Sequence, residues 1–252
     1  MPKFSLLLVL IFILMPIDGF AQSDSVDFFD NEFTFSVNSG DKESDLAAPI
    51  QVLLLLTLLS VAPAMLMLLT AFTRIVIVLS MLRQALAMPS TPPNTVLVSF
   101  ALLLTIYVML PVFEEVNRAA VTPYINKELS LSNAVDLAKE PIKEFMISQT
   151  REKDITLISD LSNVNIPSQP TDLDLSILVP AFLLSELQSA FLIGFVIFLP
   201  FLMIDLIVAS VLMSMGMIML PPTTISLPIK ILVFVLIEGW SLLAYSLVGS
   251  FR

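Results

Sequence analysis

The sequence has no cysteine, no histidine and only six glycines among its 252 residues. Without cysteine there are no disulfides, thiolate metal sites or cysteine nucleophiles. Without histidine there are no imidazole-ligated metals and no catalytic triad that uses an imidazole base. No phosphate loop, dinucleotide fingerprint or zinc pattern is present either. We therefore expect no catalytic residue, no metal and no cofactor.

Charge is also scarce, and it is unevenly distributed. Charged residues make up 13% of the chain, against an average of about 25% in soluble domains. Apolar residues make up 57%, against an average of about 45–50%. Of the 34 charges, 25 lie in residues 22–49 and 114–176. The composition excludes an ordinary soluble domain. The net charge of −10 argues against a nucleic-acid partner, because phosphate requires a basic face.

The N-terminus has the features of a secretory signal peptide. Lys3 precedes an apolar stretch at 4–15, and Gly19 and Ala21 supply the small residues before a cleavage site. An uncleaved membrane helix is the alternative, although 12 residues are few for a span. We expect cleavage after Ala21 and export to the bacterial envelope, with residues 1–21 as the signal peptide.

Beyond the signal peptide, charge and hydropathy predict four parts, all helical where ordered. The first two are an acidic periplasmic segment (22–49) and an apolar hairpin (50–113). They are followed by a polar periplasmic insert of short amphipathic helices (114–176) and a second apolar hairpin with a methionine-rich loop (177–252). Crossing a bilayer takes about 20 apolar residues. On that basis we predict membrane-type helices near 50–72, 95–113, 191–213 and 227–248. The expected fold class is all-α, with membrane-associated hairpins kinked by interior prolines.

Proline pairs mark the two hairpin turns. Pro92 and Pro93 lie in the first turn, and Pro221 and Pro222 lie in the second. We assign Arg74 and Arg83 to the first turn, together with no acidic residue, so the positive-inside rule makes this turn cytoplasmic. Connectivity then puts the acidic segment and the polar insert in the periplasm. Within the insert, Ser132 is the expected N-cap of a helix.

Isolated charges inside the apolar runs are the first candidate site. Asp205 is either a proton or ion site, or one half of a charge pair with Arg74 or Lys230. A lone carboxylate makes a poor proton relay, which favours the pair. Lys230 and Glu238 are eight residues apart and cannot pair, so we expect their partners on another subunit. Glu186 is either a helix N-terminal charge or an intersubunit contact.

Methionine is concentrated before the second proline pair. Gly216 permits a bend there, and methionine is flexible and polarizable, so the segment could form a compliant apolar plug. Lipid-facing or core-filling methionine is the alternative. A spacing of two places these residues on all sides of a helix, which a single lipid-facing stripe does not explain. The residues are Met213, Met215, Gly216, Met217, Ile218 and Met219.

Several ordered stretches resemble the FliP family of flagellar export-gate proteins, within the wider type III secretion family. They are TRIVIVL at 73–79, LRQAL at 82–86, TPPN at 91–94, PAFLLSELQSAF at 180–191, GF at 194–195, PFLMIDL at 200–206, GMIMLPP at 216–222, SLP at 226–228 and EGW at 238–240. The signal peptide and the long polar insert resemble the flagellar branch more than the injectisome branch.

This resemblance implies a subunit of a protein-conducting channel. Five copies would assemble with FliQ and FliR in the basal body at the inner membrane, next to FlhB and FlhA, and unfolded rod, hook and filament subunits would pass through. The family's methionine gasket falls on Met217 and Met219, with Ile218 in place of a usual methionine. Leu192 stands where the family usually has a polar or charged residue. The resemblance also implies that apolar helices pack on one another above the membrane plane.

We therefore expect a core subunit of the flagellar export gate, in which Asp205, Lys230 and Glu238 fix the packing between subunits. An injectisome export-gate subunit and a proton- or solute-coupled transporter remain the alternatives. For a transporter, broken helices and midplane charges are the typical signature.

Overall fold

The structure is a computed structural model that describes residues 53, 56–57, 59–61, 64–65, 67–164, 167, 172–217 and 220–251. The chain divides into two units, residues 1–65 and residues 66–252. The signal peptide, the acidic segment and most of the predicted helix at 50–72 lie outside the described residues. So do Ile218 and Met219. In the first unit the described residues are helical, and the Ser60 hydroxyl donates to the Leu56 carbonyl.

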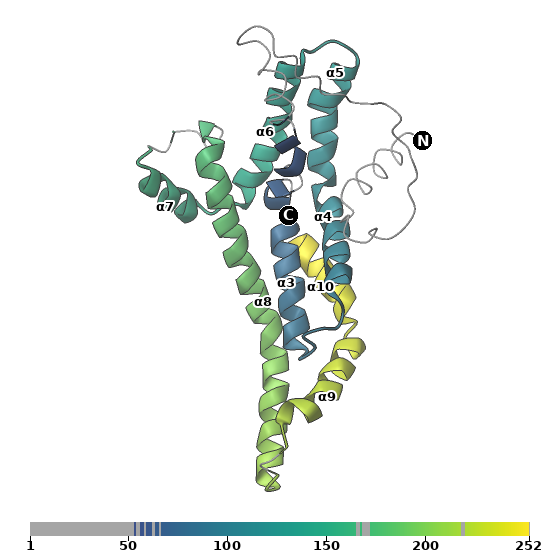
Figure 1. The fold of residues 1–252 in the computed structure, drawn as a ribbon. Coiled ribbons are helices and arrows are strands. Elements are labelled where there is room, and N and C mark those ends of the chain that lie inside the picture. Colours follow the sequence, from purple (N-terminus) through teal and green to yellow (C-terminus); the bar gives the residue numbers. More distant parts are fainter. Residues whose placement is uncertain are drawn as a thin grey trace, which may run out of the picture. The chain divides into compact units, whose positions relative to one another are not determined.

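Throughout its described residues, the second unit is helical and contains no strand, which confirms the all-α prediction (Figure 1). The elements are α3 (Phe72–Ala85), α4 (Asn94–Val116), η1 (Asn117–Val121), α5 (Thr122–Ile125), α6 (Leu131–Gln149), α7 (Glu152–Ser162), α8 (Leu175–Ser214), α9 (Pro222–Leu236) and α10 (Gly239–Gly249).

The core forms around α3, whose main partner is α8. Ile75, Val78, Leu79 and Leu82 recur at helical spacing and are buried completely or almost so. On α4, which packs beside α3, the buried residues recur every fourth position: Leu97, Ala101, Thr105 and Met109. The first hairpin turn therefore joins α3 to α4. Arg74 and Arg83 lie on α3 itself, which corrects their assignment to that turn.

Helix α8 is much longer than the predicted helix at 191–213. It begins after Asp174, whose carboxylate accepts a hydrogen bond from the Ser176 amide at 3.2 Å, as an N-cap does. Pro180 and Pro200 lie inside it. Because Glu186 is a full three turns from the start of this helix, it is not an N-terminal capping charge. Figure 1 shows α8 running beside α3 and continuing past its end.

The predicted helix at 227–248 is broken into α9 and α10. The two helices meet at 66°, and Glu238 at the break has a left-handed backbone with φ 51°. The second hairpin turn lies where it was expected, since Pro221 is the N-cap of α9 and Pro222 is its first residue.

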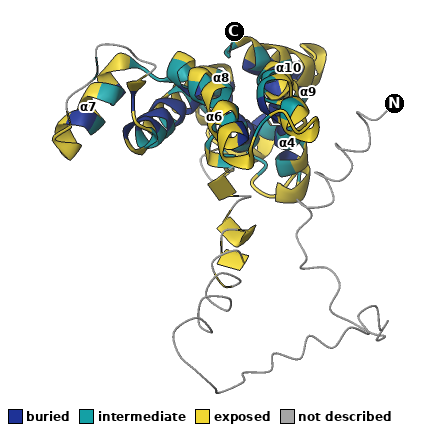
Figure 2. Ribbon diagram, turned by 90° about the horizontal axis from the view of Figure 1, so that it is seen from above, coloured by how far each residue is buried: buried dark blue, intermediate teal, exposed yellow. Residues whose placement is uncertain are grey.

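The polar insert packs against the apolar helices. Helix α6 contacts α4 and α8, and α7 contacts α8 on the side away from α4 (Figures 1 and 2). The N-cap of α6 is Ser130, whose hydroxyl accepts from the Asn133 amide; the expectation of Ser132 is wrong by two residues. Amphipathic helices were correctly predicted here, and their buried faces lie toward α4 and α8.

Within the described residues, two helical stretches are long and apolar enough to cross a membrane. They are Asn94–Ile125 and Leu175–Ser214, and the bent pair α9–α10 makes a third if it counts as one span. Helix α3, with 14 residues, is shorter than a span requires. The helices predicted at 95–113, 191–213 and 227–248 fall within these stretches. The one predicted at 50–72 lies mostly outside the described residues, so the count of four stays a prediction.

Candidate functional site

Arg74 and Glu186 form the most deeply buried ion pair among the described residues. Their side chains are 4% and 0% exposed. The Arg74 Nε donates to Glu186 Oε2 at 2.9 Å, and Nη2 donates to Glu186 Oε1, so the pair is bidentate. The two residues are 112 positions apart in sequence, which explains why periodicity did not reveal the pair.

Further contacts of the Arg74 guanidinium tie two other segments to this pair. Nη1 donates to the Ser250 carbonyl at 2.9 Å, and Nη2 donates to Gln149 Oε1 at 3.2 Å. The guanidinium also lies 3.8 Å from the centre of the Phe251 ring. We call Arg74, Gln149, Glu186 and Ser250 the Arg74 cluster. It joins α3, the end of α6, α8 and the segment after α10.

A neighbouring polar group attaches α7 to α8. The Ser185 hydroxyl donates to Asp154 Oδ2 at 2.6 Å and accepts from the Arg151 amide at 3.0 Å. Arg151 also donates to Gln188 Oε1 at 2.6 Å. Asp154, Arg151 and Ser185 were not predicted as partners from the sequence. Asp154 also pairs with Arg151, three residues earlier, at 2.8 Å, whereas Ser185 lies 31 positions away and is outside the reach of any local pattern.

Asp205 is held by residues of α9. Lys230 Nζ donates to Asp205 Oδ2 at 2.6 Å, and the Ser226 hydroxyl donates to Oδ1 at 2.6 Å. Lys230 also donates to the Ala85 carbonyl, at the end of α3, at 3.0 Å. We call Asp205, Ser226, Lys230 and the Ala85 carbonyl the Asp205 cluster. It joins α8, α9 and α3.

These contacts identify the partners of the isolated charges. The partner of Asp205 is Lys230 rather than Arg74. The expectation that Lys230 finds its partner on another subunit is wrong, because Asp205 belongs to the same chain. Glu238 is exposed and, among the described residues, has no side-chain partner. The Lys230 side chain is only 3% exposed, so loss of its carboxylate partner would leave a buried charge uncompensated. The pair joins α8 to α9.

Arg83 fixes the first hairpin turn. Its Nη1 donates to the Pro92 carbonyl at 3.2 Å and to Asn94 Oδ1 at 2.6 Å. Pro93 is the N-cap of α4. The two prolines and Arg83 therefore shape the link from α3 to α4.

The described part of the methionine segment lies at the end of α8. Met213, Met215 and Met217 are 68%, 59% and 40% exposed. Gly216 has φ 75°, and a Cβ there would meet no atom within 4 Å. The helix ends at Ser214, so Gly216 and Met217 lie in the link between α8 and α9.

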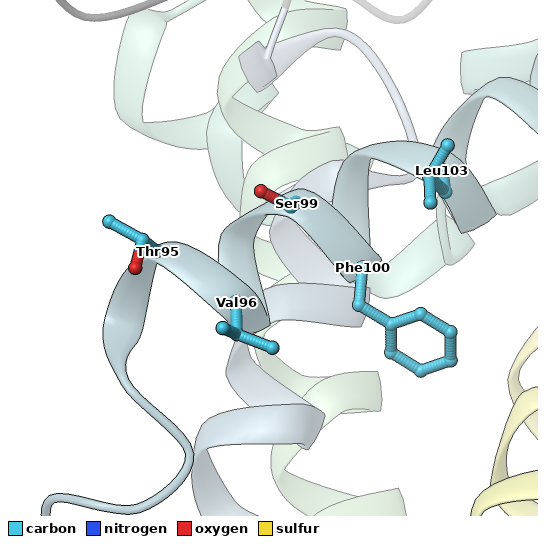
Figure 3. A pocket seen from close by; sticks show the side chains of 5 residues that line it. All are labelled: Thr95, Val96, Ser99, Phe100 and Leu103. Atoms are coloured by element: carbon cyan, nitrogen blue, oxygen red, sulfur yellow. The ribbon is translucent and has the colours of Figure 1, made fainter.

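Figure 3 shows an open hollow along one face of α4. Thr95, Val96, Ser99, Phe100 and Leu103 line it. These side chains are mainly apolar and include no titratable group. Across the described ranges, no group of three or more acidic residues is placed to hold a metal ion.

The family model described as the FliP family matches residues 55–247, which is most of the chain. The chain belongs to the FliP family. The flagellar biosynthetic protein FliP of Bacillus subtilis is 53% identical over 88% of this chain and 100% of its own length. The protein of the same name from Pectobacterium carotovorum is 50% identical over 80% of this chain and 78% of its own. The protein of the same name from Caulobacter vibrioides is 44% identical over 95% of this chain and 86% of its own length.

FliP membership confirms the family resemblance stated on the quoted motifs. FliP proteins are structural components of flagellar biosynthesis and not enzymes, so the interpretation as a non-catalytic protein follows from the family. The Arg74 cluster, the polar contacts between α7 and α8, and the Asp205 cluster lie within the matched range. The exceptions are Ser250 and Phe251, which contact Arg74 from beyond the end of that range.

Proposed function

We propose that this protein is a core subunit of the flagellar type III export gate and lines the channel for rod, hook and filament proteins. The observation that carries the proposal is the combination of FliP membership with an apolar surface that this chain leaves uncovered. The gate lies in the bacterial inner membrane at the flagellar basal body. Several copies of the chain, expected to be five, assemble there with FliQ and FliR, and FlhB and FlhA are neighbours.

The length of α8 supports an assembly. Forty residues extend about 60 Å at 1.5 Å per residue, whereas the hydrocarbon core of a bilayer is about 30 Å thick. Tilting accommodates only part of that difference. Large apolar side chains are exposed along most of the helix, from Leu184 to Met213, and Figure 2 shows exposed residues on most of the helices. A single bilayer is too thin to cover this surface, so neighbouring protein subunits are the better cover for the rest.

In this proposal the segments have separate roles. The signal peptide ends at Ala21, and residues 22–49 and 114–176 lie in the periplasm. The kinked apolar hairpins at 50–113 and 177–252 line the channel. Gly216, Met217, Ile218 and Met219 form the gasket that seals it at rest. The Arg74 and Asp205 clusters hold each subunit rigid, so that the subunits can pack side by side.

A deletion strain tests the proposed function. We expect hook protein and flagellin to disappear from the medium when the gene is deleted, and to return when it is supplied on a plasmid. Intracellular levels of both proteins serve as the control for their synthesis. Continued export without the gene would contradict the flagellar role and would direct attention to an injectisome or a transporter.

A further inference from the structure

The apolar helices of the second unit carry few charges, and most of these charges are neutralised within the chain. Residues 67–113 and 175–251 contain three basic and three acidic side chains. Four of them form the ion pairs of the Arg74 cluster and the Asp205 cluster. The other two are Arg83 and Glu238, which have opposite signs, and neither forms an ion pair with a described residue.

The hydrogen-bonding capacity of Arg83 is not used up by its own chain. Its bonds to the Pro92 carbonyl and to Asn94 Oδ1 both use Nη1. Among the described residues, Nη2 has no acceptor, and Nε is buried without one. A buried donor without an acceptor costs free energy, and two neutral acceptors leave the positive charge uncompensated. Arg83 can therefore still bind an anionic group through Nη2.

Glu238 is an exposed carboxylate in an apolar surface. It lies at the break between α9 and α10, and Leu236, Ile237 and Trp240 beside it are all exposed. A neighbouring subunit that covers these apolar side chains also removes the carboxylate from water. A charge that loses its hydration is costly unless an opposite charge compensates it. The subunit that covers this corner should therefore supply a cation.

The two groups lie at the same end of the helix bundle. The Ala85 carbonyl, two residues after Arg83, accepts a hydrogen bond from α9, and Leu86 shares the main core with Leu243 of α10. Figure 1 shows the end of α3 at about the height of the break between α9 and α10. In a ring, each copy uses two different surfaces to contact its two neighbours. Groups at one height can then meet across every interface.

We propose that Arg83 of one copy forms an ion pair with Glu238 of the next copy in the assembled gate. The two charges that the chain leaves unpaired then neutralise each other at every interface between copies. The pair also fixes the register of neighbouring subunits, because only one offset along the bundle brings the two groups together. This inference rests on the proposed function, which requires several copies, and it names the surfaces by which they meet.

Thiol cross-linking tests the contact, and the absence of native cysteine leaves only the introduced thiols to react. Two differently tagged forms of the full-length chain, Arg83→Cys and Glu238→Cys, are produced together in the deletion strain. Membranes are treated with a bis-methanethiosulfonate whose length matches an arginine–glutamate pair. We expect dimers that carry both tags, and no dimers from either form alone. A chain with both substitutions should give a ladder of larger oligomers.

The matched control uses Lys139→Cys in place of Arg83→Cys, which puts the thiol at an exposed cation of α6. We expect no dimers from Lys139→Cys with Glu238→Cys. Dimers that form equally in both combinations, or in neither, would overturn the contact. Flagellin export by the deletion strain itself would instead overturn the proposed function, while dimers through positions 83 and 238 would still support the contact.

Neutral substitutions cover the case in which the cysteine variants do not accumulate. Arg83→Gln keeps an amide donor for the turn, and Glu238→Gln keeps the size of the side chain. We expect either change alone to lower the amount of oligomer extracted from membranes severalfold, because one charge stays unpaired in the interface. The double variant should recover most of the oligomer, since it removes both charges.

Independent effects of the two substitutions, with a double variant worse than either single one, would contradict the pair. Phospholipid that copurifies with the unaltered protein and is lost from Arg83→Gln but not from Glu238→Gln would assign Arg83 to a lipid phosphate. That result, without the 83–238 link, would also overturn the proposal.

Discussion

At the scale of single residues, the Arg74–Glu186 pair has the largest expected effect. Both groups are buried, and Arg74 also holds Gln149 and Ser250. Removing one partner of a buried pair leaves the other charge uncompensated, at a cost of about 3–5 kcal/mol. We predict that Glu186→Ala lowers the free energy of unfolding by this order, measured by denaturant titration of the detergent-solubilised protein.

The exposed pair of Lys139 and Asp136 provides the comparison, with side chains 51% and 68% exposed. Asp136→Ala should change stability by less than about 1 kcal/mol. The double variant Arg74→Met with Glu186→Met should recover part of the loss, since an apolar pair leaves no buried charge. A double variant as unstable as Glu186→Ala would contradict this explanation.

A second residue-scale prediction concerns Gly194. A Cβ at this position would lie 2.3 Å from the Met81 sulfur, so the glycine allows α8 to approach α3 closely. The clashing atoms are the flexible end of the half-buried Met81 side chain, which can shift, so we predict a loss for Gly194→Ala near the lower end of the overpacking range, about 1 kcal/mol. Adding Met81→Ala should cancel the clash in a double-mutant cycle. Gly249→Ala is the control, because nothing lies within 4 Å of its added Cβ.

At the scale of elements, the break between α9 and α10 depends on Glu238. Its left-handed backbone costs a residue with a Cβ roughly 1–2 kcal/mol, a cost that glycine avoids. We predict that Glu238→Gly leaves the unfolding midpoint unchanged or raises it. Glu238→Val should lower the midpoint, because a β-branched residue fits this conformation worst. A higher unfolding midpoint for Glu238→Val than for Glu238→Gly would mean that the bend does not depend on a left-handed backbone at residue 238.

The methionine segment gives the second prediction at this scale. Met217 is exposed just beyond the end of α8, where a flexible apolar side chain can seal a channel. We predict that Met217→Ala and Met217→Asp, each alone or with the same change at Met219, raise ion conductance of the resting gate. Met203→Ala, at a position 57% exposed in the interior of α8, is the control. Normal assembly with unchanged conductance would count against a gasket.

Local sequence patterns predicted some elements well and others poorly. The helix expected at 95–113 is present as α4, because its whole signal lies in one uninterrupted apolar run. The start of α8 was missed by 16 residues, since 191 was expected and Leu175 is observed. Ser185, Glu186 and Gln188 interrupt the hydropathy there. Their partners are supplied by α3 and by Arg151 and Asp154, which no local pattern contains.

Partners that are distant in sequence also limited what could be predicted about the charged residues of the candidate site. Arg74 looks like a loop residue until its partner on α8 is known. Asp205 and Lys230 were recognised as a possible pair from the need to neutralise a charge among apolar residues, and the structure joins them. The break at Glu238 was missed because both flanks are apolar and helical; the glycine that follows was the one local signal.

At the scale of the whole molecule, the apolar surface is the dominant property. The exposed large apolar residues cover faces of α4, α8, α9 and α10, and the buried polar clusters stiffen the chain behind them. A rigid subunit with uncovered apolar faces is suited to packing in a ring around a channel. The central claim is that the chain contacts the substrate as it passes through the channel.

Site-specific photo-cross-linking tests that claim most directly. A photoreactive amino acid at Met217 is combined, in cells, with a flagellar substrate stalled by fusion to a tightly folded domain. We predict a cross-link between position 217 and the stalled substrate, and none from position 245, where Tyr245 is 83% exposed on α10. Substrate cross-links absent at 217 but present at 245 would contradict a channel lined by the methionine segment.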